Sequence, residues 1–195
     1  MRRTLAGSLT ALMLLLAGGA VAQGPGGGKK GPPPPALRVT STSWADGAEV
    51  PAKYSFVGGS TSPALEWTNV PMGTVTFAIL FHDPDVALQR KLDDVTHWIA
   101  WNIPGTTTKL DEGIKEGATL PDGTIQGKNI RGQNAYMGPG APASGPHHHY
   151  TLELFALDTK LDLGPDASRA DVMKALEGHI LGKAVWVGRY HQPQQ

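Results

Sequence analysis

The 195-residue sequence contains no cysteine and carries no net formal charge, because 17 Lys and Arg balance 17 Asp and Glu. The absence of cysteine excludes disulfide bonds, thiolate metal ligands, a cysteine nucleophile and a lipid-modified N-terminal cysteine. The balanced charge offers no basic surface to hold nucleic acid or an anionic membrane, so we expect no nucleic-acid partner. Without disulfides, a folded domain must rely on its own hydrophobic core, and a chain of this length can build one.

Long apolar runs are also scarce, and the one near the N-terminus, residues 9–17, is too short to span a membrane comfortably. Arg2 and Arg3 precede it, and Ala20-Val21-Ala22 follows with the small-x-small pattern of a cleavage site. We therefore predict a signal peptide at residues 1–22 rather than a membrane anchor. Cleavage would lower the basic count from 17 to 15 against 17 acidic residues, a net charge of −2. It would leave no transmembrane anchor, and the protein would be periplasmic or secreted.

Composition divides the rest of the chain into three parts. Residues 23–35 read QGPGGGKKGPPPP and have no apolar side chain to bury, which predicts a disordered or polyproline spacer. We expect the folded domain at residues 36–191 and a short tail at residues 192–195. No repeat of fixed period is present.

Alternating or continuous apolar segments predict most of the secondary structure. Strands are expected at residues 37–42, 62–67, 75–81, 97–103, 150–157 and 184–190. The segment 75–81 is nearly all apolar, which indicates a strand buried on both faces. In the segment 150–157, the side that begins with Tyr150 is wholly apolar and the other side is mixed. Residues 89–94 are expected to form a charged, exposed excursion, and residues 111–131 a long loop.

One helix is predicted between residues 162 and 182. Ser168 and Asp171 have the spacing of a capping box with the shorter acid. One face of this helix would carry Val172, Met173, Leu176 and Ile180. Strands separated by long loops, with one late helix, favour a mainly antiparallel β-fold with a peripheral helix.

Polar residues recur at the expected strand ends, and they suggest one shared pocket. Asp83 and Asp85 follow one buried strand, His97 begins the next, and His148 and Tyr150 open a third. The preceding segment 138–146 is rich in Gly and Pro, so it must be a shaped loop rather than helix or central strand. Imidazolium groups and loop amides together would suit phosphate or another anion.

These residues also admit other interpretations. The adjacent residues His147, His148 and His149 resemble a metal patch, but neighbours on a strand point to opposite faces and cannot all bind one ion. A site of His147 and His149 with Asp83 is the remaining metal alternative, and we expect neither a metal nor another cofactor. Ser144 near His147 suggests the possibility of a hydrolase active site, but no G-x-S-x-G elbow surrounds Ser144.

Ordered motifs give the chain a family resemblance. They are SPALEW at 62–67, FHDPD at 81–85, HWIAWNIP at 97–104, YMGP at 136–139, PHHHY at 146–150, LFALD at 154–158, GHILGKA at 178–184 and VGRY at 187–190. In this order they resemble the phosphatidylethanolamine-binding protein family, which includes the Raf kinase inhibitor protein of animals, and most closely its bacterial branch. The resemblance covers residues 37–190 and implies a β-sandwich of one large antiparallel sheet packed on a smaller one, with a C-terminal helix.

The resemblance also implies a ligand pocket rather than an active enzyme. The family's pocket residues fall on Asp83, His97, His148 and Tyr150, with a wall at Gly138, Pro139 and Pro142; Asp85 is expected to shape the turn. The family's DPDAP becomes DPDVA at 83–87, and its GPCPP becomes GPGAP at 138–142, which predicts a looser wall. The excursion at 89–94 is longer than in bacterial relatives.

We therefore predict an exported, non-enzymatic protein that binds a small anion, such as phosphate or acetate, or a phospholipid headgroup. One alternative is an inhibitor that contacts a kinase or protease through the loops around the pocket. Another is a weak phosphoester hydrolase that uses Asp and His as acid and base.

Overall fold

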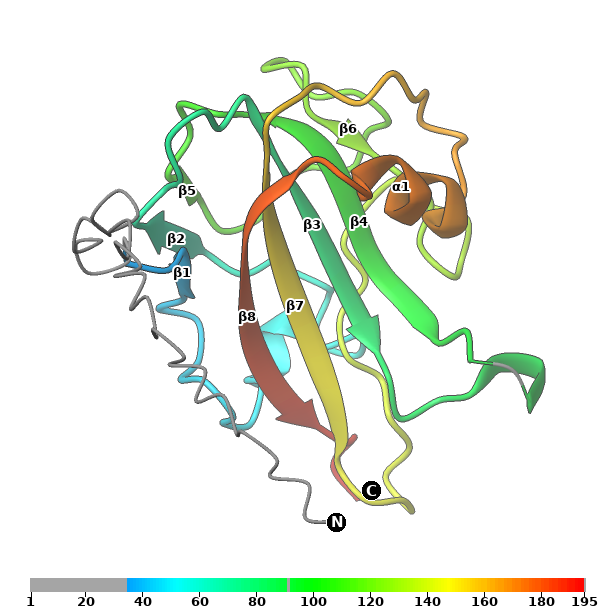
Figure 1. Ribbon diagram of the computed structural model, residues 1–195. Coiled ribbons are helices and arrows are strands. Elements are labelled where there is room, and N and C mark those ends of the chain that lie inside the picture. Colours follow the sequence, from blue (N-terminus) through cyan, green and yellow to red (C-terminus); the bar gives the residue numbers. More distant parts are fainter. Residues whose placement is uncertain (1–34, 91, 195) are drawn as a thin grey trace, which may run out of the picture. The chain divides into compact units, whose positions relative to one another are not determined.

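The fold consists of two antiparallel β-sheets in a computed structural model that describes residues 35–90 and 92–194. The smaller sheet has the order β1 (Arg38–Thr40), β2 (Leu65–Thr68) and β5 (Lys109–Leu110). The larger sheet has the order β6 (Ile125–Gln126), β4 (Val95–Pro104), β3 (Thr76–Asp83), β7 (His148–Leu157) and β8 (Ile180–Tyr190). The long strands β4, β3, β7 and β8 run side by side in Figure 1.

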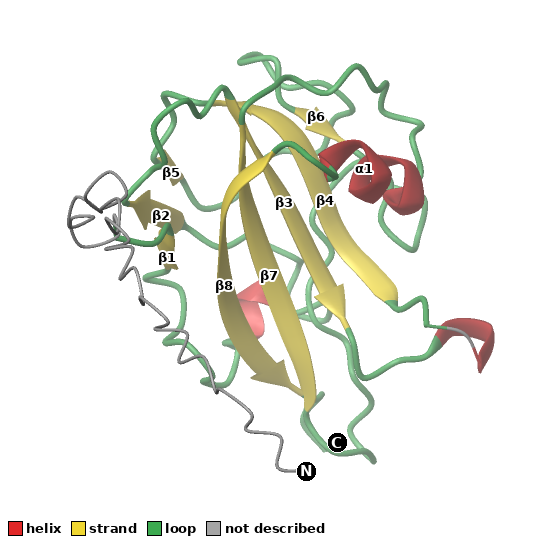
Figure 2. Ribbon diagram, in the orientation of Figure 1, coloured by secondary structure: helices red, strands yellow, loops and turns green. Residues whose placement is uncertain are grey.

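Helices are few, as the colouring of Figure 2 makes clear. The described residues contain one α-helix, α1 (Arg169–Leu176), and two short 3₁₀ helices, η1 (Ala52–Tyr54) and η2 (Leu88–Arg90). None of the helices in this part of the chain is both long enough and apolar enough to cross a membrane. The predicted signal peptide and all of the predicted spacer except Pro35 lie outside the described residues. The mainly β, two-sheet fold predicted from the sequence is confirmed.

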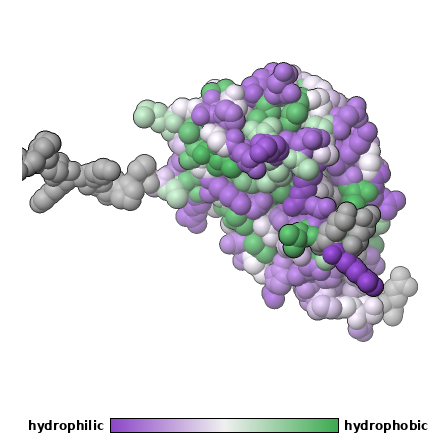
Figure 3. Space-filling model, turned by 45° about the vertical axis from the view of Figure 1, so that its right-hand side comes forward, coloured by the Kyte–Doolittle hydropathy of each residue, from purple (hydrophilic) through white to green (hydrophobic). Residues whose placement is uncertain are grey.

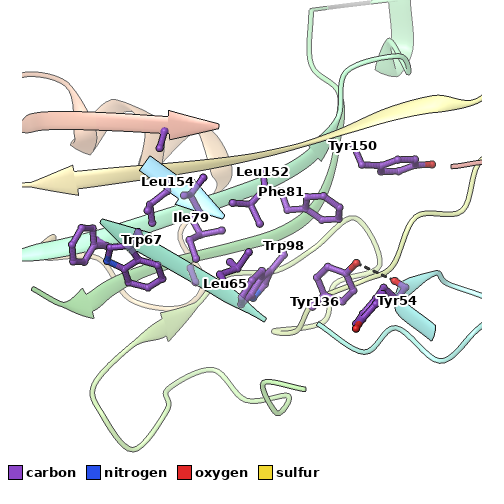
Figure 4. Packing of buried hydrophobic residues seen from close by; sticks show 14 of the residues in the cluster. Tyr54, Leu65, Trp67, Ile79, Phe81, Trp98, Tyr136, Tyr150, Leu152 and Leu154 are labelled. Carbon is purple, nitrogen blue, oxygen red and sulfur yellow. Dashed lines mark hydrogen bonds between the residues drawn. The ribbon is translucent and has the colours of Figure 1, made fainter. Parts of the chain in front are cut away.

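The central strands β3 and β4 of the large sheet are buried on both faces, which explains their apolar sequences. On one face, Phe77, Ile79 and Phe81 of β3 join Leu65 and Trp67 of the small sheet in the inner core (Figure 4). On the other face, Ala78 and Leu80 of β3 join side chains of α1 in an outer core. In β7 the side that begins with Tyr150 lies in the inner core, whereas Phe155 and Leu157 lie in the outer core. The sequence pattern of these two central strands therefore predicts their burial correctly.

The helix is shorter than the predicted region, and one residue was placed on it wrongly. Ser168 is the N-cap, and its hydroxyl accepts a hydrogen bond from the Asp171 N–H, while the Asp171 carboxylate accepts one from the Ser168 N–H. After Leu176 the chain turns at Gly178, whose φ of +84° suits glycine. Ile180 therefore begins β8 instead of lying on the apolar helix face, and it is 45% exposed.

Two features of the loops depart from the sequence expectation. The two-residue strands β5 and β6 are too short to produce a periodic pattern, and they were not predicted. Asp94 of the charged excursion is largely buried instead of exposed, because it pairs with the imidazole of His82 at 2.8 Å and with Arg169 of the helix. Elsewhere, hydrophobic side chains are scattered among hydrophilic ones on the surface drawn in Figure 3.

Candidate ligand-binding site

A cavity of about 340 Å³ opens where the chain enters or leaves three strands of the large sheet. Its size lies in the usual range for sites that bind small molecules. The lining residues are Phe56, Asp83, Val86, Val95, His97, Ile130, Arg131, Met137, Gly138, Gly140, Ala141, Pro142, His148, Tyr150 and Gln192. The four polar residues predicted to meet, Asp83, His97, His148 and Tyr150, all line this cavity. They come from three strands, since His148 and Tyr150 share β7.

Antiparallel pairing of β3 with β7 brings the first two of these residues together. Asp83 ends β3 and His148 begins β7, and the register pairs His82 with Thr151. The Nδ1 of His148 lies 2.8 Å from the Asp83 Oδ2, so the ring donates its Nδ1–H to the carboxylate. The other carboxylate oxygen, Oδ1, accepts a bond from the Asp85 N–H at 3.0 Å. Only the Nε2 of His148 remains for a ligand.

His97 is held in one tautomer by the backbone. Its Nδ1 lies 2.9 Å from the carbonyl oxygen of Met137, which can only accept, so Nδ1 carries the proton. Burial lowers the pKa of His97 below its ordinary value of 6.5, although the bond to Met137 and the charge of Asp83 oppose the shift. At neutral pH the ring is therefore uncharged, and its Nε2 is an acceptor. It can donate to an anion only after taking up a proton.

Tyr150 braces the cavity wall. Its hydroxyl oxygen accepts hydrogen bonds from the N–H of Gly140, at 3.2 Å, and of Ala141, at 2.9 Å. Burial, followed by the charge of Asp83, raises the pKa of Tyr150 well above the ordinary value of 10.0. The hydroxyl therefore stays protonated throughout the physiological range. Gln192 holds the same wall from its other side, donating its N–H to the Ala141 carbonyl at 2.9 Å.

These bonds correct one part of the sequence interpretation. The amides of the Gly-rich loop were expected to bind an anion, but those of Gly138, Gly140 and Ala141 already donate within the protein. The Gly138 N–H donates to the Ser60 Oγ at 3.0 Å, and the other two donate to Tyr150. The GPGAP wall is held by the side chains of Ser60 and Tyr150, and its looseness relative to the family's GPCPP stays a prediction. These three amides are therefore not available to an anion, whereas the side chains of His148, His97 and Arg131 are.

The three predicted wall residues have different positions. Gly138 lines the cavity, but its lack of a side chain serves packing, because a Cβ there would lie 2.3 Å from the carbonyl carbon of Ser55. Pro142 lines the cavity at its exposed edge. Pro139 is not among the lining residues, and its carbonyl accepts from the Phe56 N–H at 2.8 Å.

Several lining residues were missed by the sequence interpretation, and Arg131 is the most consequential. Within residues 35–90 and 92–194 it is the only Lys or Arg that lines the cavity, and its guanidinium lies 5.1 Å from the ring centroid of Phe56. Arg131 ends the long loop at 111–131, whose lack of periodicity hid it. Gln192 was assigned to the tail, yet it lines the cavity. The apolar residues Val86, Val95, Ile130 and Met137 lack any local signal of a site.

The structure gives little support to the alternative metal site and hydrolase site. His147 and His149 do not line the cavity, and His149 instead donates its N–H to the Asp85 carboxylate at 2.6 Å. Asp85 also lies outside the lining, in keeping with a role in the turn. Partial burial favours a higher pKa for Asp85, but the hydrogen bonds from His149 outweigh it and lower the pKa of this carboxyl group. Among the described residues, no group of three His, Cys, Asp or Glu is arranged to hold a metal ion. Ser144 is exposed and does not line the cavity.

Known proteins resemble this chain in sequence and in structure. A family model for phosphatidylethanolamine-binding proteins matches residues 40–191. A UPF0098 protein of Methanothermobacter thermautotrophicus is 38% identical over 156 residues, which cover 80% of this chain and 99% of that protein. The UPF0098 protein YbcL of Escherichia coli is 34% identical over 157 residues, covering 76% of this chain and 84% of that protein.

Solved structures agree with the sequence matches. The crystal structure of Escherichia coli YbcL, described as a member of the mammalian phosphatidylethanolamine-binding protein family, superposes with a TM-score of 0.73 at 32% identity. A phosphatidylethanolamine-binding protein homologue of Chlamydia trachomatis superposes with a TM-score of 0.71 at 28% identity. Each match covers 80% of this chain and 98% of the other.

Fold and site together define a β-sandwich protein with a cavity at the ends of three strands of its larger sheet, where a few polar side chains stand among mostly apolar ones. The chain belongs to the phosphatidylethanolamine-binding protein family. The family predicted from the ordered motifs is therefore confirmed.

Proposed function

We propose that the protein binds a small anion, such as phosphate or acetate, or the phosphate-bearing headgroup of a lipid, and does not act on it chemically. The observation that carries this proposal is the convergence of the Asp83–His148 pair, His97 and Arg131 on one cavity. Membership of the family supports the choice of ligand class.

Charge balance explains how an anion is accommodated beside Asp83. A carboxylate alone would repel the ligand, but a protonated His148 makes the pair neutral and turns Nε2 into a donor. Arg131 adds positive charge at the exposed side of the cavity. His97 supplies a further donor when an anion draws a proton onto its Nε2. The apolar side chains of Val86, Val95 and Met137 suit the carbon atoms next to a phosphate in a headgroup.

The residues that line the cavity support a binding role rather than a catalytic one. Among the described residues that line the cavity none is Ser, Thr or Cys, and the hydroxyl of Tyr150 stays protonated and engaged with the loop amides. Hydrolysis of a phosphoester would thus need a water molecule activated by a histidine. A phosphatase screen that found turnover, lost in His97→Ala, would favour the hydrolase instead.

Titration of the histidine rings tests the binding site directly. Sulfate, phosphate and phosphoethanolamine are added in turn to protein with isotope-labelled histidine, and the ring signals are followed by NMR. We expect millimolar ligand to shift His97 and His148, while His149, which lies outside the cavity, serves as the internal control. Sulfate does not titrate near neutral pH, so any proton taken up with it belongs to the protein. Shifts confined to His149, or none at all, would refute the proposal.

Export is the second part of the proposal, and it rests on the sequence of residues 1–22 alone. The positive start, the apolar centre and the Ala20-Val21-Ala22 pattern support a cleaved signal peptide. Fractionation of cells that make the full chain, followed by N-terminal sequencing, tests it. We expect exported protein that begins at Gln23, and uncleaved protein in the cytoplasm would contradict export.

A further inference from the structure

The end of the described chain folds back onto the cavity wall through Gln192. Its backbone N–H donates to the Ala141 carbonyl at 2.9 Å, and its side-chain Nε2 donates to the Gly140 carbonyl at 3.4 Å. Gln192 also lines the cavity itself. In Figure 1 the C-terminal end of the chain lies beside the segment that enters β7. The position of Gln192 therefore affects how closely this side of the cavity is covered.

His191, the residue before Gln192, is tied to the start of β7 by an aromatic contact. Its ring lies against the ring of His147, with the centroids 3.9 Å apart and the planes inclined by 50°. The contact extends the ladder between β7 and β8 by one position, because the pair before it joins His148 to Tyr190. The two histidine rings thus hold the chain end in register with the strand that carries the anion-site residues.

This contact suits a neutral His191 ring. The Nδ1 of His191 is buried and forms no hydrogen bond with any described residue. A neutral ring with its proton on Nε2 has only a lone pair at Nδ1, whereas an imidazolium has an N–H and a positive charge there. Burial of a charged donor without a partner is costly. The ring can therefore take up a second proton only by leaving its place.

The neighbouring charges act in the same direction. The Nε2 of His147 lies 3.9 Å from the Glu49 carboxylate, which stabilises a positive charge on His147 and so places a cation against His191. The charged or titratable groups at the adjoining ladder positions, with their ion-pair partners, are Asp83, Asp85, His148, His149 and Arg189. Both of these aspartates are already bonded to a histidine, and Arg189 adds further positive charge.

We propose that His191 is a positioning residue that holds Gln192 on the cavity wall while its ring is neutral, and that protonation of His191 releases both residues from the wall. Imidazole groups change charge between about pH 5 and pH 8, so release occurs in mild acid. The bonds to Ala141 and Gly140 are then lost, and the cavity opens on this side. Release of the chain end stands on these contacts alone, whereas its effect on a ligand rests on the proposed anion site.

Exchange of the Gln192 amide hydrogen measures the release without any ligand. Its protection relative to the free-peptide rate is compared by NMR at about pH 7.5 and about pH 5.5. We expect protection in the wild type to fall about tenfold in acid, because two like charges repel at this separation. His191→Phe keeps a ring against His147 but takes up no proton, so it should stay protected at both pH values. His191→Ala lacks the ring and should be poorly protected at both.

His179→Phe is the matched control. His179 precedes the opposite end of β8 and is bonded to Asp158 at 2.8 Å, so its replacement should leave the wild-type pH profile unchanged. A Gln192 amide that is equally protected in acid would overturn the proposal. A loss of protection that persists in His191→Phe would also overturn it, because another group would then be responsible.

Sulfate binding at the same two pH values separates the chain end from the anion site. We expect the wild type and His191→Phe to bind sulfate equally at the higher pH. At the lower pH the variant should bind about threefold more tightly, because its wall keeps the bonds from Gln192. If sulfate bound to neither protein, the proposed function would fail while the release of the chain end stood. Equal affinities in acid, together with a released chain end, would refute its effect on the cavity.

Discussion

The Asp83 carboxylate and the His148 imidazole lie 2.8 Å apart although 65 positions separate them in the chain. The side chain of Asp83 is 4% exposed and that of His148 is 17% exposed, so the ring is the more accessible member of the pair. The carboxylate fixes the tautomer and orientation of the ring, much as a buried acid orients a catalytic histidine in other proteins. Because Nδ1 is bonded to Asp83, the pair presents the Nε2 of His148 to a ligand.

Replacement of His148 tests both its structural and its binding role. In His148→Gln, the buried Asp83 loses its side-chain donor and keeps only the bond from the Asp85 N–H. We expect the free energy of unfolding to fall by about 1–3 kcal/mol. The phosphate-induced shift of the His97 ring should disappear. Urea unfolding and histidine NMR measure the two effects.

The adjacent residue His149 gives a matched control. Its side chain is exposed and contacts Asp85 outside the cavity. We expect His149→Gln to change stability by no more than about 0.5 kcal/mol. Phosphate binding should not change. Equal losses of binding in the two variants would show that the charge of the loop, and not the cavity, attracts the anion.

Arg131 should supply long-range attraction with little effect on the fold. In Arg131→Gln we expect phosphate affinity to fall about fivefold, the effect of one exposed charge a few ångströms away. The difference from wild type should shrink as salt is added. Arg38→Gln, an exposed arginine of β1 outside the cavity, is the control and should bind normally. Titration calorimetry at two salt concentrations measures both effects. An affinity that is equal in Arg131→Gln and in wild type would show that Arg131 does not contribute to binding.

His97 should make the fold sensitive to mild acid. Burial lowers the pKa of His97 below 6.5 in the folded protein, so the unfolded chain binds the proton more readily. The stability linked to this residue is complete above pH 6.5 and is lost as the pH falls from 6.5 through the folded-state pKa. His97→Asn keeps a donor for the Met137 carbonyl but does not titrate. Urea unfolding at pH 7.5 and at about pH 5.5 should show a smaller loss in the variant, and an unchanged loss would assign the effect to other histidines.

Local patterns of the sequence were enough to predict the central strands and their burial. The alternation at 150–157 and the continuous apolar segment at 75–81 report directly on how many faces of each strand are covered. The capping box at Ser168 marked the start of α1 correctly. The end of the helix was harder, because Ile180 continues the helical spacing after Gly178 has already turned the chain.

The polar contacts that complete the site could not be predicted in this way. Arg131, Gln192 and the bonds from the loop amides to Tyr150 join positions that are distant in sequence or lack periodicity. Nothing in the sequence distinguishes Tyr150, whose hydroxyl accepts two amide hydrogen bonds, from any other tyrosine on a strand. The motifs of the family identified Asp83, His97 and His148 because they mark positions directly. An inhibitory contact with a kinase or protease through the surrounding loops stays a prediction.

Gln126 is a buried hub that organises the long loop. It is 0% exposed, and its Nε2 donates to the carbonyls of Lys115 and Gly117 at 2.9 Å, while its Oε1 accepts from Trp98. In Gln126→Leu the buried indole N–H of Trp98 and the carbonyls of Lys115 and Gly117 would lose these bonds. We expect a loss of about 3 kcal/mol or more in unfolding free energy. Amide exchange should become faster across the loop.

The control for this variant is Gln133, whose exposed side chain makes no hydrogen bond to a described residue. Gln133→Ala should change stability by no more than about 0.5 kcal/mol. If Gln126→Leu were as stable as this control, the loop would have to be ordered by its apolar contacts alone.

Of two glycines in the same cavity wall, only Gly138 should be sensitive to replacement by alanine. A Cβ at Gly138 would lie 2.3 Å from the carbonyl carbon of Ser55 and 2.4 Å from the carbonyl oxygen of Tyr54, so rigid backbone would have to move. A Cβ at Gly140 would meet the Phe56 Cβ at 3.5 Å, an ordinary contact. We expect Gly138→Ala to lower the unfolding free energy by about 3 kcal/mol and to weaken anion binding, because the displaced wall carries the Met137 carbonyl that orients His97. Gly140→Ala should do neither, so similar unfolding curves for the two variants would show that the wall yields at Gly138.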